Sequence, residues 1–558
     1  MGMLFLFLAQ TYAMHSTSYQ RRHSREDERV HLVHADRLEA DQYRFPGAQI
    51  LFGHVTLTHS GMRLKCDSAV LYQGSNSFMA VGHVRLTQGD TLSLTGDSLY
   101  YDGTGQLAQV FSHVVMRHRT LTLYTEHFNY DRIAQRGYYN DGGKLVDNGA
   151  TLTSLLGDYF TSQRRAEFYR EVQLVSKQRD TLVTDTLHYD TRSKWAHAMG
   201  PSNIYSGDSH IYTEDGTYNS ETGEAMLCYS KGHRYRPQLF NKRRKLVGDS
   251  IVYDKKTQVA QAFRNIRFDD PDSKCTLIGH YGYYDDSRGE AMATDRALAK
   301  EYSNPEDTLF MHADTLRLYS YNLKTDSAYR VMHAYPHARA FRSDVQAVSD
   351  SLVFHSARRL LSLYRDPIVW SDNKQVLGEE INVYCNDSTV DSIYVERQAL
   401  LAEKIADDKY NQVAAQTLRA YYDGGELREG QAERNVQIVN YPMEKDSTYL
   451  YQNFLTTARM RLFMENKKVK RIWAGPASDG KVYPIGTAPA QHTHLGGFAW
   501  FDYIRPLSKD DLMEWRGKRG GSQLKDKPRR QAPRQILPSS PSEGEADEFS
   551  TPNSDANG

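Results

Sequence analysis

Short stretches in which every second residue is apolar recur along most of the chain. GDSLYYD (96–102), TDTLHYD (184–190) and GDSIVYD (248–254) each carry an apolar and an aromatic residue two and four places after the acid. Positions two and four places along lie on the same face of a strand but on different sides of a helix. Each phrase therefore predicts a short β-strand with one apolar face.

The phrase returns at a nearly constant interval, with gaps of 27 to 36 residues between its acids. A second alternating phrase of the V-x-L type usually follows each acid by 14 to 19 residues, and turn-like pieces such as DGTGQLA (102–108) leave no room for a helix. Such spacing predicts a repeat architecture. We call the recurring residue the anchor; the anchors are Asp36, Asp67, Asp97, Glu126, Asp158, Asp185, Glu214, Asp249, His280 (in place of an acid), Asp314, Asp350 and Glu379.

One such repeat cannot bury its apolar face alone, but stacked repeats can. We therefore expect an all-β, elongated body, a β-solenoid or folded-over β-jelly-roll of ~30-residue repeats, on the order of 60–115 Å long. The anchor acids recur through most repeats, which favours turn-capping over a catalytic carboxylate pair.

The pattern divides the chain into five segments. Residues 1–13 resemble a clipped secretory signal peptide, which predicts export. Residues 30–210 and 211–395 form two continuous stretches of repeat. Residues 396–515 hold a degenerate repeat and an aromatic-rich piece that we expect to cap one end of the stack. Residues 516–558 have the low-complexity composition of a disordered tail.

Within the degenerate segment, residues 396–420 are rich in Ala, Lys and Glu, and this composition indicates a helical turn or two.

Composition narrows the class of protein. Lysine plus arginine equals aspartate plus glutamate at 69 each, so no overall charge favours nucleic acid, and we expect no nucleic-acid partner. Only 39% of residues are apolar, whereas tyrosine occurs 38 times, which suits many half-exposed strands. Four cysteines (66, 228, 275 and 385) fit no zinc-site spacing, and two disulfides or four free thiols are both open.

No motif for catalysis or for a cofactor stands out, so we expect no enzymatic activity, no cofactor and no metal. His492 and His494 alternate on a strand pattern, but no further ligand lies near except Asp502, so chance explains the pair better than a metal site. The basic run at 242–245 is read as an exposed hairpin loop rather than a phosphate site.

The apolar face is the remaining candidate for function. If its two walls close tightly it is only a core, and if they part it is a trough suited to an acyl chain. The pattern leaves both states open. The residues expected to line this groove are Val55, Leu57, Val84, Leu86, Leu99, Tyr101, Val114, Phe128, Tyr130, Leu187, Tyr189, Ile251, Tyr253, Ile266, Phe268, Leu352 and Phe354.

The phrases ADRLEAD (35–41), GDSLYYD (96–102) and GHVRL (82–86), in register over a dozen copies, resemble the OstA/LptA family of organic-solvent-tolerance and lipopolysaccharide-transport proteins. The match covers roughly residues 30–395, and the length and C-terminal aromatic segment resemble a long form of the family that lacks a membrane barrel. The resemblance implies a "β-taco", a V-shaped pair of sheets whose interior holds the lipid A acyl chains of lipopolysaccharide.

The resemblance also implies a location and partners. The protein would be periplasmic and associated with the outer membrane, and it would bridge the inner and outer membranes during outer-membrane assembly. Its partners would be an inner-membrane transporter subunit and an outer-membrane translocon, joined end to end by β-strand pairing. The alternative functions are a carbohydrate-binding β-solenoid and a structural spacer of the cell envelope.

Overall fold

The protein is described here from a computed structural model. The described residues are 29–303, 307–322, 325, 328–386, 389–443, 448–466 and 468–517. The expected signal peptide at 1–13, and the expected tail at 516–558 apart from its first two residues, lie outside them.

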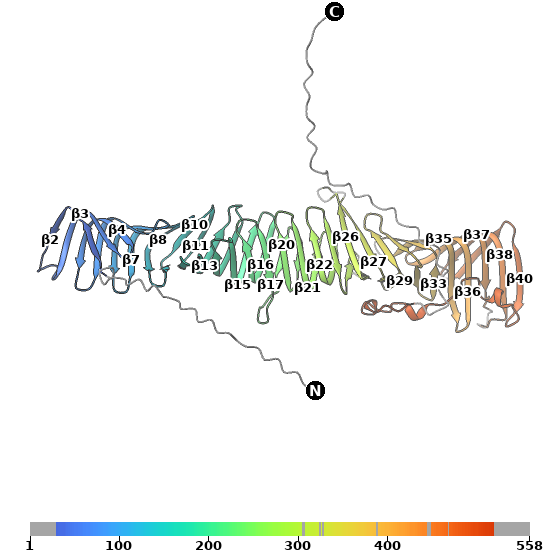
Figure 1. Ribbon diagram of the computed structural model, residues 1–558. Coiled ribbons are helices and arrows are strands. Elements are labelled where there is room, and N and C mark those ends of the chain that lie inside the picture. The colour runs from blue at the N-terminus through green and yellow to red at the C-terminus, as the bar shows by residue number, and fades with distance from the viewer. Residues whose placement is uncertain are drawn as a thin grey trace, which may run out of the picture.

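Forty antiparallel strands form one long sheet that is folded lengthwise into two facing walls (Figure 1). Each wall carries about 28 strands side by side, so a strand spacing of about 4.8 Å gives a body roughly 130 Å long. The expected elongated all-β fold is therefore confirmed. The remaining regular elements are short: α1 (Ala490–Thr493), η2 (Asp502–Ile504) and η3 (Asp511–Met513).

Sixteen long strands contribute one half to each wall. They are β3 (Ala48–His59), β4 (Met62–Tyr72), β5 (Ser77–Gln88), β6 (Leu92–Asp102), β7 (Leu107–His118), β8 (Leu121–Asp131), β13 (Arg165–Val175), β14 (Thr181–Asp190), β15 (Trp195–Ser206), β16 (Ser209–Asn219), β21 (Val259–Asp270), β22 (Cys275–Asp285), β35 (Val390–Ala406), β36 (Lys409–Asp423), β37 (Glu426–Asn440) and β38 (Tyr451–Glu465).

The other strands belong to one wall each. Wall 1, which holds the half-strands that follow the anchors, adds β2 (Arg37–Glu39), β9 (Arg136–Tyr139), β12 (Leu156–Phe160), β17 (Glu224–Cys228), β20 (Ser250–Asp254), β23 (Glu290–Thr294), β26 (Thr315–Tyr321), β27 (Tyr329–Tyr335), β30 (Ser351–His355), β31 (Leu360–Tyr364), β34 (Glu380–Cys385) and β39 (Lys468–Gly475). Wall 2 adds β1 (His31–His34), β10 (Gly143–Asp147), β11 (Ala150–Ser154), β18 (Gln238–Asn241), β19 (Arg244–Val247), β24 (Leu298–Glu301), β25 (Leu309–His312), β28 (Ala338–Phe341), β29 (Gln346–Ser349), β32 (Ile368–Ser371), β33 (Lys374–Leu377) and β40 (Asp479–Pro484).

The walls join along a crease, where the long strands bend. The register of β5 shifts between Val81 and Val84, and Gly82 and His83 at this bulge both have positive φ. Asp67 of the neighbouring strand lies against the bulge and accepts a hydrogen bond from His83 Nδ1 at 2.7 Å. A β-bulge bends its strand and increases the local twist, so it turns β5 from wall 1 into wall 2.

The anchors therefore mark the crease and not hairpin turns, and the turn-capping expectation is wrong. Asp97 lies in the middle of β6, and its carboxylate bonds His113 Nδ1 at 2.8 Å. The bulge residues have positive φ, so their sequence resembles that of a turn.

The expected helical turns at 396–420 are also wrong, because β35 and β36 cover most of this segment. Each of these strands pairs with neighbours on both sides, and such pairing outweighs a weak local preference for helix.

The segment expected to cap one end runs back along the outer face of wall 2. We call residues 489–517 the strap. It covers an apolar cluster on the outer face that includes Trp370, Leu377, Val439 and Phe454, to which it adds Leu495, Phe501 and Ile504. No helix among the described residues is long and apolar enough to cross a membrane.

Candidate functional site

The edge opposite the crease is a seam, where the hairpin turns of the two walls meet. In several repeats the tyrosine four places after an anchor lies at this edge. Its hydroxyl group can therefore bond a polar side chain of the opposite wall. Tyr101 of wall 1 has its hydroxyl 2.7 Å from Nδ1 of His59 in wall 2, and Arg132 Nη1 donates to the same hydroxyl at 3.0 Å. Burial raises the pKa of Tyr101, so the hydroxyl stays protonated at neutral pH.

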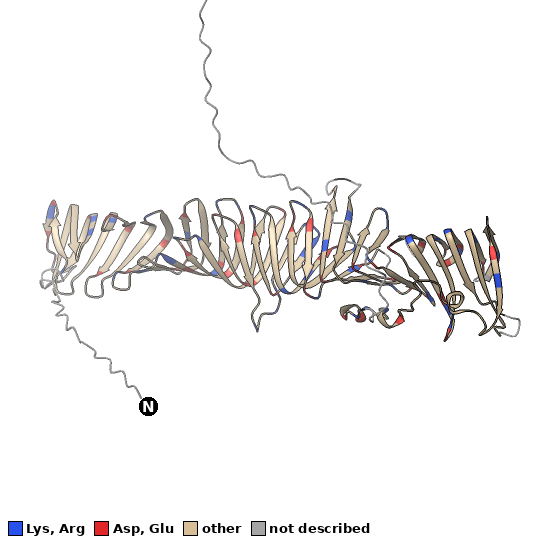
Figure 2. Ribbon diagram, turned by 45° about the vertical axis from the view of Figure 1, so that its right-hand side comes forward, with Lys and Arg blue, Asp and Glu red and all other residues tan. Residues whose placement is uncertain are grey.

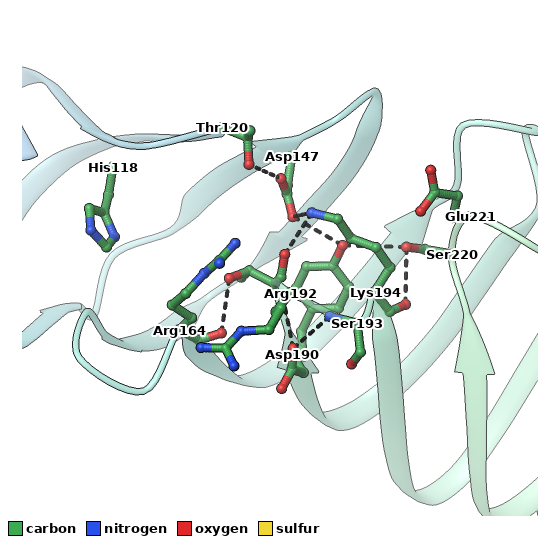
Figure 3. A network of polar contacts seen from close by, with 12 residues as sticks. His118, Thr120, Asp147, Arg164, Asp190, Arg192, Ser193, Lys194, Ser220 and Glu221 are labelled. Atoms are coloured by element: carbon green, nitrogen blue, oxygen red, sulfur yellow. Dashed lines mark hydrogen bonds and ion pairs between the residues drawn. The ribbon is translucent and has the colours of Figure 1, made fainter. Parts of the chain in front are cut away.

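A second contact across the seam is built on a carboxylate in place of a histidine. Asp147 of wall 2 accepts hydrogen bonds from Lys194 Nζ at 2.5 Å, Thr120 Oγ1 at 2.9 Å and Tyr189 Oη at 3.3 Å (Figure 3). Its side chain is fully buried, and that of Lys194 is 12% exposed. A buried carboxylate is tolerated only when it is paired in this way.

Three further sites belong to the same row. Tyr159 bonds His118 at 2.7 Å, and burial lowers the pKa of this histidine. Asp180 accepts from Tyr218 at 2.7 Å and from Lys255 at 2.6 Å. We call these cross-seam bonds latches; the last of them joins Arg330 to Asp270 at 3.3 Å.

Behind the latches the inner face is a closed core. Sixteen of the seventeen residues expected to line a groove are buried, with exposures between 0 and 7%, and they pack against one another across the two walls. Only Phe354 is partly buried. The predicted residues therefore share one continuous apolar core, and over β3–β30 they fill it.

The inner face opens farther along, between β35 and β39. There an apolar hollow of about 280 Å³ lies between the walls. Leu401, Val413, Ile438 and Leu455 line it from wall 2. Leu418, Leu427, Leu462 and Ile472 line it from wall 1. Ile472 is 54% exposed, so the hollow reaches solvent at β39.

The sequence analysis missed this hollow because the repeat decays after Glu379. A signal was present, since Leu418 and Ile438 continue the alternation in the degenerate repeat. Polar residues, among them Lys374, Glu403 and Asn411, lie on the wall 2 side of the hollow. An apolar cavity with a few polar groups at its border is the usual form of a ligand site.

The remaining candidates have local structural roles. His492 Nδ1 bonds Tyr483 Oη at 2.8 Å and its ring stacks on Phe454, while His494 stacks on Phe498. In the basic run, Arg244 bonds Tyr284 and Asp286, and Arg243 pairs with Asp272.

All four cysteines are free thiols. Basic and acidic residues are interspersed along the body (Figure 2).

Both ends of the body leave strand edges without a neighbour among the described residues. At one end β1 and β2 pair only with β3, and at the other β39 and β40 pair only with β38. Val469, Trp473 and Val482 are about half exposed or more on this last pair. Unpaired edges with apolar side chains are suited to pairing with a further strand.

Comparison with known proteins finds a family model that matches part of the chain. Residues 27–180 match the family model described as OstA-like protein. No curated protein matches the chain. Among solved structures, the chain is similar to LptH of Pseudomonas aeruginosa, described as the LptA homologous periplasmic component of the lipopolysaccharide transport device. The two are 19% identical over 25% of this chain and 81% of that one, with a TM-score of 0.14. The family match thus confirms the resemblance predicted from the repeats: residues 27–180 are similar to OstA-like proteins.

Proposed function

We propose that this protein binds the acyl chains of lipopolysaccharide on its inner face, in the periplasm, and bridges inner-membrane and outer-membrane components of lipopolysaccharide transport. The apolar hollow between β35 and β39 carries the proposal. It is open to solvent at one end, is lined by aliphatic side chains from both walls, and lies on the same inner face that is filled elsewhere. Such a surface binds alkyl chains without directional bonds.

The closed stretch from β3 to β27 has a different role in this proposal. Its core is filled and its seam is latched, so it serves as a rigid spacer that sets the distance to the hollow. The predicted groove residues, Val55 to Leu352, would touch an acyl chain only after the latches open. A purely structural spacer is therefore the second candidate function, and the filled core favours it over a carbohydrate-binding solenoid.

The partners would attach at the two ends. The unpaired edges of β1 and β2 and of β39 and β40 would each receive a strand of a neighbouring transport component, with main-chain hydrogen bonds continuing the walls. Because the hollow opens at β39, a partner at that end would extend the apolar surface without a break.

Photo-crosslinking tests the acyl-binding proposal. A photoreactive residue at Leu462 or Leu427 faces the hollow, and the neighbouring Arg461 and Arg428 are exposed controls on the same strands. We expect covalent lipopolysaccharide at the two leucines and none at the two arginines. A probe at Leu99 or Tyr101, with Ser98 and Arg85 as outward controls, reports whether the latched core opens. Equal labelling at Leu462 and Arg461, or no labelling at either leucine, would reject acyl binding and leave the spacer.

A further inference from the structure

A second cavity lies on the seam where the row of latches ends. Its volume is about 160 Å³, and both walls line it. Three arginines contribute: Arg330 and Arg359 from wall 1, and Arg342 from wall 2. We call this cavity the arginine slot. It contrasts with the hollow between β35 and β39, whose lining is mainly aliphatic.

Arg330, which lines the arginine slot, has an unused donor. The residue is 9% exposed, its Nη2 donates to Asp270 at 3.3 Å, and its buried Nε has no hydrogen-bond partner among the described residues. A buried guanidinium N–H without an acceptor is rare, and each such group needs an explanation. An anion in the slot would supply the acceptor.

The second arginine reaches the slot from the opposite wall. Arg342 is 7% exposed and holds Asp344 with Nε at 2.6 Å and Nη2 at 2.9 Å. This pair fixes the guanidinium plane beside the cavity. Ser303 and Ser356 also line the slot, and a serine hydroxyl can donate to an anion.

Two carboxylates line the slot as well, and local bonds engage both. Glu301 accepts from the backbone N–H of Ser303 at 3.0 Å, and Asp307 accepts from the backbone N–H and the hydroxyl of Ser343. The lining thus holds three guanidinium groups and two carboxylates, and Asp270 and Asp344 pair with Arg330 and Arg342 beside it. Fixed, weakly hydrated guanidinium groups favour tetrahedral oxyanions such as phosphate.

The arginine slot also neighbours the apolar hollow. Cys385, which lines the slot, ends β34, and β34 pairs with β35. On its other side β35 pairs with β36. Strand β36 contributes Leu418 and Ala420 to the hollow. A cationic site and an apolar site consequently follow each other along one seam.

We propose that the arginine slot binds the phosphate group of an amphiphile whose alkyl chain occupies the hollow. This inference rests on the proposed function and names the chemistry of the headgroup: a phosphate monoester or diester, held by Arg330 and Arg342 from opposite walls. A free inorganic phosphate has the same chemistry, so the test separates the two sources.

The test compares dodecyl phosphate, dodecyl maltoside and inorganic phosphate, titrated by calorimetry into the full chain, with the detergents below their micelle concentrations. We expect dodecyl phosphate to bind at least about tenfold more tightly than dodecyl maltoside, as charge-assisted bonds require. Arg330→Gln with Arg342→Gln should abolish this preference and leave dodecyl maltoside binding unchanged. Arg85→Gln, an exposed position on β5, should behave as the wild type.

Each of the other outcomes also decides for or against the arginine slot. No preference for the phosphate headgroup in the wild type, or a preference that survives the double substitution, overturns the slot. If neither detergent binds but inorganic phosphate binds the wild type and not the variant, the anion site stands and the acyl-binding function fails. The Arg330→Lys, Arg342→Lys variant keeps both charges, and a partial preference there supports the slot even where the glutamine variant does not fold.

Discussion

Tyr101 and His59 are 42 residues apart in the chain, and 2.7 Å separates the hydroxyl of the first from Nδ1 of the second. The bond spans the two walls, so it holds the seam closed over the apolar core. Tyr101→Phe removes the hydroxyl and leaves His59 and Arg132 without this partner. We expect a loss of about 1–3 kcal/mol in the free energy of unfolding, measured in urea.

Tyr100→Phe is the matched control, because Tyr100 lies on the same strand, faces outward and is 40% exposed. Its substitution should change the unfolding free energy by less than about 0.5 kcal/mol. Equal effects of the two substitutions would show that the cross-seam bond contributes nothing.

The latch at Asp147 should show strong coupling between its partners. Asp147→Asn leaves the Lys194 ammonium buried without a counter-charge, and we expect a loss of about 3–5 kcal/mol in unfolding free energy. Lys194→Met in the same chain should restore part of this loss, which a double-mutant cycle measures. Asp208→Asn, in the exposed pair with Lys242, should cost less than about 0.5 kcal/mol. A strictly additive cycle would contradict the buried ion pair.

The crease depends on glycine at Gly82. A Cβ added there would lie 2.3 Å from Asp67 Oδ2, and the residue has φ +80. Gly82→Ala should therefore cost about 2–3 kcal/mol, more than the strain of positive φ alone. Gly89→Ala, at φ +60 with nothing near the new Cβ, isolates that strain at about 1 kcal/mol. Adding Asp67→Ala should rescue Gly82→Ala and not Gly89→Ala, as thermal unfolding would show.

The crease histidines should make stability depend on pH. The hydrogen bond that His83 donates to the Asp67 carboxylate raises the pKa of His83, and a bond to Asp97 does the same for His113. Because the folded pKa exceeds the unfolded value of about 6.5, this contribution is complete below that pH and is lost as pH rises through the folded pKa. The Tm difference between wild type and His83→Gln should therefore be larger at pH 5.5 than at pH 8.5.

NMR titration of the His83 ring gives the folded pKa directly and should place it above 6.5. His118 should have the opposite effect on the pH dependence of stability. Burial lowers its pKa, so its contribution to stability is lost as pH falls. A Tm difference for His83→Gln that is constant with pH would contradict the Asp67 contact.

The strap should detach when the glutamine that binds it to wall 2 is replaced. Gln412 is fully buried, donates to Thr493 O and accepts from Leu495 N, each at 2.9 Å. Gln412→Ala leaves both backbone groups unpaired, and we expect a loss of about 2–4 kcal/mol in strap binding. Proteolysis within 489–517 and binding of an apolar dye to the uncovered Trp370 cluster measure it. Gln437→Ala, at an exposed position on β37, is the control and should leave the strap protected.

The alternation of apolar residues predicted the fold well, since Leu99 and Tyr101 can share a face only in a strand. It did not locate the crease, because a bulge such as Gly82–His83 uses the same positive-φ residues as a turn. It could not decide between core and trough, because that depends on contacts such as Tyr101 with His59, which link residues about 40 apart. The strap could not be predicted either. It covers Trp370 on the outer face of wall 2, and only the register of the strands shows which residues lie on that face.

A long strand in this body bonds only to the strands that adjoin it along the two walls, as β5 does with β4 and β6. A hairpin of two such strands can therefore be inserted or removed without altering the packing of more distant ones. Every inserted pair would lengthen the body by roughly 10 Å. The number of hairpins therefore sets the length of the body.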